Sequence, residues 1–241
     1  MRMRTIAILL MFAGAAAGQL GVPRIGCFVD DQRRLRALSG VAANFLVGAP
    51  EAEEAISAAC SGSLVLIKKD GLLEVRNGEG VVEWPAPGGP ALFGFSPNGS
   101  AALVYYPETK EWFRVGRHAP APLPAPEGEV VAIGSPEGPA AVVRRDGGLW
   151  IVGADERPAP PDAAEPLLLL PDGGLLYARG KELVLAEADG AERSFALPAA
   201  AEGLEWLGRG WVRVSLGEAS GHLALALENR NELYRLPEVT P

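Results

Sequence analysis

The sequence predicts an all-β fold, a β-propeller of about six four-stranded blades. Three segments share one pattern, an apolar strand, a tight turn that carries Gly and a second apolar strand: residues 92–106, 130–145 and 167–178. The turn prolines Pro97, Pro136 and Pro171 are 39 and 35 residues apart. Repetition at this period with β patterning is typical of a radial array of small sheets. A second observation agrees: Gly and Pro number 30 and 21, while 48% of the residues are hydrophobic, as expected for many turns between short buried strands.

Residues 1–18 are predicted to be an export signal. Arg2 and Arg4 form a basic start, residues 5–17 are apolar, and three alanines at 15–17 suit a signal peptidase. An apolar run of about 13 residues is shorter than the roughly 20 that a membrane-spanning helix needs, which favours cleavage over a retained anchor. We therefore expect residues 19–241 to form a single propeller domain, secreted or periplasmic, with no membrane span. At about 37 residues per unit the length suggests six blades and leaves five or seven open.

The first two units follow the N-terminus. Residues 25–30 and 35–38 are predicted to form a hairpin, and residues 44–48 a further strand. Residues 51–59 have a helix-forming composition after Pro50. Alignment with the repeat favours a strand at 56–60 instead, followed by strands at 63–68, 72–76 and 81–84.

Two central units each end in a proline-rich segment. Strands at 92–96, 101–106 and 111–115 lead into residues 117–126, and strands at 130–134, 140–144 and 149–152 lead into residues 157–166. Proline cannot donate to a sheet ladder, so we interpret both segments as irregular outer edges of blades. A polyproline ligand at residues 120–126 is the alternative.

Two further units complete the array. Strands are expected at 167–170, 175–178, 183–186 and 193–197, then at 204–206, 211–216, 223–227 and 232–236. If the last unit lacked an outer strand, a strand near Ile25 would complete it. We expect such an N-terminal strand to close the ring.

One turn resembles that of a known family. Phe95-Ser96-Pro97-Asn98-Gly99, followed by an apolar strand, resembles the turn of WD40-like repeats in TolB-type periplasmic propellers, and residues 134–138 and 170–173 keep part of it. The pattern over residues 24–237 is also similar to that of uncharacterised secreted bacterial propellers. The resemblance implies a fold, an exported location and a protein-binding role, and it implies no catalytic residue.

Cys27 and Cys60 are the two cysteines of the chain. In an oxidising compartment they would close a disulfide, and two separately buried thiols are the alternative. Neither cysteine has a His or a second Cys nearby, which argues against a metal site.

The candidate chemistry is sparse. His118 lies in a proline-rich loop and His222 follows a Gly at a strand start, so neither is assigned a catalytic role. Most acidic residues precede Gly in turns, as at Asp172 and Asp189, where turn chemistry explains them. We therefore predict no catalytic, cofactor-binding or metal-binding residues.

Five tryptophans are candidates for a ligand surface: Trp84, Trp112, Trp150, Trp206 and Trp211. Of these, Trp112 and Trp150, together with His118, are the chosen ligand-surface candidates. Packing between blades is the competing interpretation, and exposure of three or more rings on one face would favour the ligand surface.

Charge excludes one partner class. Without Arg2 and Arg4 the chain has 20 basic and 30 acidic residues, which makes nucleic acid an unsuitable partner. The sequence favours a non-catalytic module that binds a protein or cell-envelope partner. A propeller hydrolase or lyase and a glycan-binding propeller are the alternatives. Neither the partner nor the oligomeric state follows from the sequence.

Overall fold

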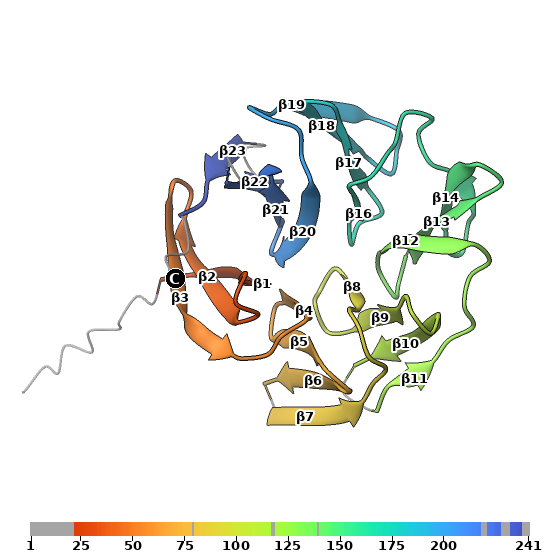
Figure 1. Cartoon of the computed structure of the whole chain (residues 1–241). Coiled ribbons are helices and arrows are strands. Elements are labelled where there is room, and N and C mark those ends of the chain that lie inside the picture. Colours follow the sequence, from red (N-terminus) through yellow and green to blue (C-terminus); the bar gives the residue numbers. More distant parts are fainter. Residues whose placement is uncertain are drawn as a thin grey trace, which may run out of the picture.

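The computed structural model describes residues 22–78, 80–116, 119–138, 140–217, 221–227 and 232–237. Six antiparallel sheets stand around a common centre like the blades of a propeller (Figure 1). The predicted fold class is confirmed, with no helix among the described elements. The described residues accordingly include no helix that is long and apolar enough to cross a membrane. The predicted export signal lies outside them.

Each blade is built from strands that are consecutive in the chain. The first three blades are blade 1, of β1 (Arg24–Val29), β2 (Leu35–Val41) and β3 (Asn44–Ala52); blade 2, of β4 (Ser57–Ser61), β5 (Leu64–Lys69), β6 (Leu72–Asn77) and β7 (Gly80–Pro85); and blade 3, of β8 (Leu92–Phe95), β9 (Ala102–Tyr106), β10 (Glu111–Val115) and β11 (Ala121–Pro122). The others are blade 4, of β12 (Glu129–Ile133), β13 (Ala141–Arg145), β14 (Gly148–Val152) and β15 (Arg157–Pro158); blade 5, of β16 (Leu167–Leu169), β17 (Leu175–Arg179), β18 (Glu182–Ala186) and β19 (Glu192–Ala196); and blade 6, of β20 (Gly203–Gly208), β21 (Trp211–Ser215), β22 (His222–Ala226) and β23 (Glu232–Arg235).

Local chemistry explains the turn between β8 and β9. Ser96 is buried, and its Oγ accepts hydrogen bonds from the backbone N–H groups of Ser100 and Ala101 at 3.1 and 3.0 Å. Gly99 has a φ of 66°, a conformation that side chains disfavour. A Cβ at Gly99 would also lie 2.9 Å from the carbonyl oxygen of Ser61 in the next blade. The Ser-Pro-Asn-Gly turn is therefore structural, as expected.

The core is divided into six clusters of buried apolar side chains, each between two neighbouring blades in the described part of the chain. Between blades 1 and 6, for example, Ile25 and Phe28 pack with Leu207 and Ala224. Burial of apolar surface at every blade interface is what holds a ring of small sheets together.

Strands form in the segments for which the sequence left alternatives open. The strand predicted at residues 56–60 is confirmed as β4, which begins one residue later at Ser57, and no helix forms there. The proline-rich segments contribute β11 and β15, which have only two residues each and confirm the irregular outer edges. Blades 3 and 4 therefore have short outer strands, whereas β3 of blade 1 has nine residues.

The predicted closure by an N-terminal strand is wrong in its topology. Blade 6 has its own outer strand, β23, and β1 pairs with β2 in blade 1. Blade 1 has three strands, and β1 occupies its innermost position. The ring closes instead by packing: a Cβ added to Gly26 of β1 would lie 1.8 Å from the carbonyl oxygen of Leu207 in β20.

The direction of β1 also differs from that of the other inner strands. Ile25 and Gly26 adjoin Gly208 and Leu207, whereas Val29 lies with Glu205 at the channel wall. Thus β1 runs antiparallel to β20. By contrast, β4 runs parallel to β20, because Cys60 at the end of β4 adjoins Gly208.

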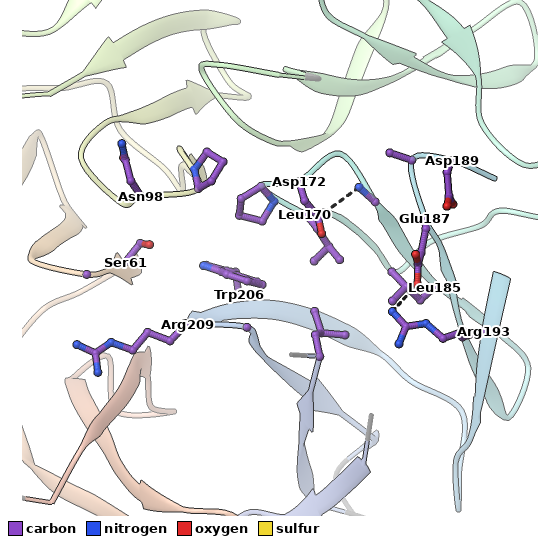
Figure 2. Close-up of a pocket in the computed structure, with 17 residues that line it drawn as sticks. Ser61, Asn98, Leu170, Asp172, Leu185, Glu187, Asp189, Arg193, Trp206 and Arg209 are labelled. Carbon is purple, nitrogen blue, oxygen red and sulfur yellow. Dashed lines mark hydrogen bonds and ion pairs between the residues drawn. The ribbon is translucent and has the colours of Figure 1, made fainter. Parts of the chain in front are cut away.

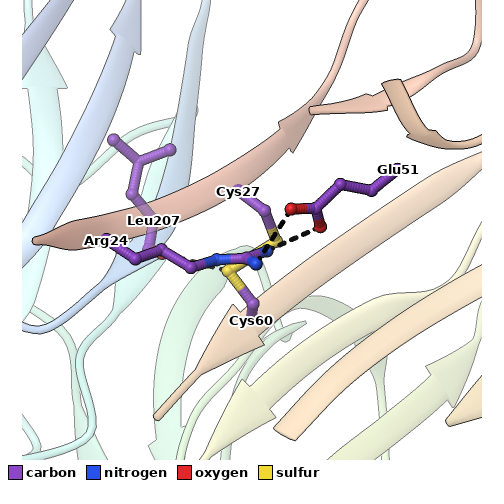
Figure 3. Close-up of a disulfide and its surroundings, with 5 residues drawn as sticks. All are labelled: Arg24, Cys27, Glu51, Cys60 and Leu207. Atoms are coloured by element: carbon purple, nitrogen blue, oxygen red, sulfur yellow. Dashed lines mark hydrogen bonds and ion pairs between the residues drawn. A yellow bond between two sulfur atoms is a disulfide. The ribbon is translucent and has the colours of Figure 1, made fainter. Parts of the chain in front are cut away.

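Cys27 of β1 and Cys60 of β4 are paired in the structure, with their Cα atoms 5.9 Å apart (Figure 3). Both residues are at most 4% exposed. The bond joins the inner strands of blades 1 and 2. Beside it, the guanidinium of Arg24 donates two hydrogen bonds, of 3.0 and 2.9 Å, to the carboxylate of Glu51 in β3.

Candidate functional site: a cavity at one mouth of the central channel

The inner strands surround a narrow channel of about 280 Å³. Its described lining is mostly apolar, with Ser57 and Glu205 as the side chains that carry polar groups besides the indole of Trp206. Such a wall offers few groups that could act together on a substrate at the axis.

A larger cavity, of about 720 Å³, lies at the channel end where β4, β8, β16 and β20 finish (Figure 2). The turns that follow these four strands contribute Gly62, Asn98, Asp172 and Arg209 to its lining. The turns at Glu187–Asp189 and Leu227 extend it toward the rim. We call this space the mouth cavity; its volume is in the range typical of ligand pockets.

Blade 5 forms an acidic wall of the mouth cavity. Asp172 and Asp189 each accept a hydrogen bond of 3.0 Å through Oδ1 from a backbone N–H of their own turn, from Gly174 and Ala191 respectively. Glu187 instead forms an ion pair of 2.5 Å with Arg193. The two aspartates make no ion pair in the described structure, so their charges remain available.

The opposite wall carries a cation. Arg209 lies in the turn after β20, is exposed, and has no carboxylate partner among the described residues. Its φ of 47° fixes the turn in the left-handed region. Figure 2 shows Arg209 with Ser61 and Asn98 on the side away from the carboxylates of blade 5.

Trp206 of β20 forms the floor. It lines both the mouth cavity and the channel, so its half-buried indole separates the two spaces (Figure 2). Its Nε1–H is buried and has no hydrogen-bond partner in the described part of the chain. The same holds for Nε of Arg193, which also lines the mouth cavity. Two donors of this cavity therefore remain unsatisfied by the protein.

A second polar cluster joins blades 1 and 6. Arg213 donates a hydrogen bond of 3.1 Å to Glu205, and its guanidinium carbon lies 4.7 Å from the ring centre of Phe28. Arg213 also lies 2.9 Å from Nε2 of His222; since a guanidinium only donates, Nε2 is the acceptor and the imidazole is neutral.

Burial governs the protonation of this cluster. Burial raises the pKa of Glu205, and the nearby charge of Arg213 opposes that shift only in part. Burial, followed by the charge of Arg213, lowers the pKa of His222. The sequence did not predict this cluster, because its three members come from separate strands and only the fold brings them together.

The two described ligand-surface candidates, Trp112 and Trp150, both pack in the apolar cluster between blades 3 and 4. Trp112 is 5% exposed and packs edge-on against Tyr105, with ring centres 6.1 Å apart. Trp150 is half-buried beneath Arg145, whose guanidinium carbon lies 4.6 Å from the ring centre. His118 lies outside the described residues. All five tryptophans are buried or half-buried, so the rings fill space within and between blades.

The described residues contain no group of three or more His, Cys, Asp or Glu side chains arranged to hold a metal ion. The structure confirms that Asp172 and Asp189 are turn residues. Their turns converge on one space with Arg209, which the sequence alone does not predict.

Comparisons with known proteins show the fold. No family model and no curated protein matches the chain. Among solved structures, hydrazine synthase of Kuenenia stuttgartiensis is 10% identical, with a TM-score of 0.50 over 90% of this chain and 80% of that one. A streptogramin B lyase is 12% identical, with a TM-score of 0.49 over 91% and 86%. The WD40 domain of SCAP from fission yeast is 12% identical, with a TM-score of 0.38 over 82% and 58%. At these identities the likeness concerns the fold alone and says nothing about activity.

Proposed function

We propose that this chain is an exported, non-catalytic propeller of the TolB-like kind that binds a protein partner in the cell envelope or the extracellular space. The observation that carries the proposal is the mouth cavity. Turns from four blades contribute to it, and it holds uncompensated charges of both signs. Charged groups at the rim of a pocket favour recognition and orientation of a partner.

The channel beneath the cavity supports binding over hydrolysis. An enzyme would need polar groups from several inner strands close to one reacting atom. The described channel wall instead consists largely of Ala, Leu, Ile, Val and Phe side chains. A rigid scaffold with a recessed mouth suits a binding module.

An enzyme is the second candidate, and the observation in its favour is the cluster of Glu205, Arg213 and His222. Burial raises the pKa of Glu205, and a buried carboxyl group with a raised pKa beside a cation is typical of groups that exchange protons in active sites. Hydrolase and lyase screens on the purified protein test this candidate directly. Activity abolished by Glu205→Gln would contradict the non-catalytic proposal.

The main proposal is tested by mild crosslinking of tagged mature protein in its exported fraction, followed by mass spectrometry. The variant is Arg209→Glu, and the control is Lys110→Glu. Arg209 and Lys110 are both exposed cations with positive φ, of 47° and 59°. Arg209 lies in the turn between β20 and β21 at the mouth cavity, whereas Lys110 lies in the turn between β9 and β10, at the other end of the strands. The two substitutions therefore change charge equally.

The expected result is a reproducible protein partner with the wild type and with Lys110→Glu, and its loss with Arg209→Glu. Equal recovery with both variants would exclude the mouth cavity as the binding site. Recovery of the propeller alone would contradict the protein-binding function.

A further inference from the structure

The mouth cavity divides its charge between two sides. Once Glu187 is paired with Arg193, the described lining retains two uncompensated carboxylates, Asp172 and Asp189, and one uncompensated cation, Arg209. The carboxylates belong to blade 5, whereas Arg209 follows the inner strand of blade 6, whose Gly208 adjoins Cys60 of blade 2. Figure 2 shows these groups on opposite sides of Trp206.

The carboxylates are held in place. Because Oδ1 of Asp172 and of Asp189 accepts a turn N–H, each carboxylate has a fixed position, and its other oxygen is free to accept a hydrogen bond. Fixed acceptors lose little entropy when a cationic partner binds. Arg209 provides the complementary fork of donors for a carboxylate.

The floor between these charges is apolar. Leu170, Leu185 and Leu227 line the cavity beside Trp206. Fixed carboxylates on one side and a guanidinium on the other complement a peptide that carries both charges, whereas a neutral glycan carries neither.

We infer that the mouth cavity binds a short peptide segment of its partner that carries a basic side chain and a carboxylate. The basic side chain faces Asp172 and Asp189 of blade 5, the carboxylate faces Arg209, and the intervening backbone lies over Trp206. This inference rests on the proposed function and specifies the chemistry of the partner.

The test begins with selection from a random heptapeptide library on the immobilised, oxidised mature protein. Peptides with one basic and one acidic position are expected to be enriched. A selected peptide is then labelled, and its affinity is measured by fluorescence anisotropy at low and moderate salt. An added glycan array on the same protein tests the competing ligand class.

The variants separate the two walls. Asp172→Asn and Asp189→Asn together keep both Oδ1 turn acceptors and remove the charges, and Arg209→Gln removes the cation. Each should weaken peptide binding about tenfold, close to the 1.4 kcal/mol equivalent of that factor, while Lys110→Gln changes nothing. Replacement of the peptide's acidic residue by Lys should restore binding to Arg209→Glu.

Three outcomes would overturn the inference: selected peptides without the charge pair, affinities unchanged in the variants, or displacement of the peptide by a bound glycan. If crosslinking still recovers a partner through Arg209 while no charge-paired peptide is selected, the proposed function stands and this inference fails. If no partner is recovered at all, the proposed function fails on its own test.

Discussion

Blade 1 differs from the other five blades in the number of its strands and in the direction of its inner strand. In blades 2 to 6 four consecutive strands form each sheet, whereas blade 1 has three, with β1 antiparallel to β20 at its inner position. Blade 1 also contains the disulfide partner Cys27 and the buried carboxylate of Asp30. The comparison shows that an inner position demands a buried apolar strand and tolerates either direction. In blade 1 the disulfide and the ion pairs of Asp30 with Arg34 and Arg36 act in a sheet that has no fourth strand.

The largest expected effect concerns the disulfide. Cys27→Ala with Cys60→Ala should lower the free energy of unfolding by about 3 to 4 kcal/mol in the chain-entropy model, for residues 33 positions apart. Thermal unfolding of the variant and of the reduced wild type measures the effect. Non-reducing peptide mapping should recover the linked pair. Two freely alkylated thiols in the native protein would show that no disulfide stabilises blade 1.

The tight contact between β1 and β20 gives the second effect. Gly26→Ala places a Cβ 1.8 Å from the carbonyl oxygen of Leu207, and Gly94→Ala creates the same 1.8 Å contact with Gly134 between blades 3 and 4. Because backbone must move in both cases, each should cost about 2 to 3 kcal/mol of unfolding free energy.

Chemical denaturation measures both, with Gly48→Ala as the control. A Cβ at Gly48 would meet its nearest atom at an ordinary 3.5 Å, so this variant should stay within about 0.5 kcal/mol of the wild type. If Gly26→Ala lowered the free energy of unfolding much less than Gly94→Ala, the contact between β1 and β20 would be less tightly packed than the contact between blades 3 and 4.

Acid should weaken blade 1 selectively. Asp30 is 7% exposed; burial opposes its ionisation, but hydrogen bonds from Arg36 and Arg34 outweigh burial and lower its pKa to about 2. A lowered pKa in the folded state stabilises the fold above the ordinary value of 3.8, and this contribution is lost as the pH falls toward 2.

Asp30→Asn should therefore reduce stability by about 2 kcal/mol at pH 7, and the difference from the wild type should fall below about 0.5 kcal/mol near pH 2. Urea titrations at several pH values provide the measurement. A difference that persists unchanged at pH 2 would assign the effect to packing and not to charge.

The smallest expected effect is at the surface of the same blade. The ion pair between Arg24 and Glu51 is partly exposed, with side-chain exposures of 40% and 31%. Arg24→Ala should change the free energy of unfolding by about 0.5 kcal/mol or less, and less still in high salt. A loss above 1 kcal/mol in thermal unfolding would indicate that the partly exposed ion pair between Arg24 and Glu51 also stabilises blade 1.

The parts of the fold that local chemistry controls could be predicted. The turn of Ser96 and Gly99 carries its own hydrogen bonds and its own φ requirement, so its sequence predicts the hairpin. The proline-rich outer edges follow similarly from the missing N–H of proline. These features depend on neighbours within a few positions of the chain.

The rest depends on contacts between distant segments. The direction of β1 is set by its fit against Leu207, which no periodicity reveals. In the same way, Asp172, Asp189 and Arg209 belong to separate turns, and only the radial arrangement of blades brings them to one cavity. Turn residues were identifiable from the sequence; their convergence was not.

The junction of β1 with β20 has a consequence for the order of assembly. Gly26 and Leu207 are about 180 positions apart in the chain, whereas Cys27 and Cys60 are 33 apart. Blades 1 and 2 can therefore dock and oxidise soon after they are synthesised, but the exposed apolar side of blade 1 stays uncovered until the final blade emerges. A nascent chain arrested before residue 203 would be an open arc with two unprotected ends, the form most prone to association with other chains.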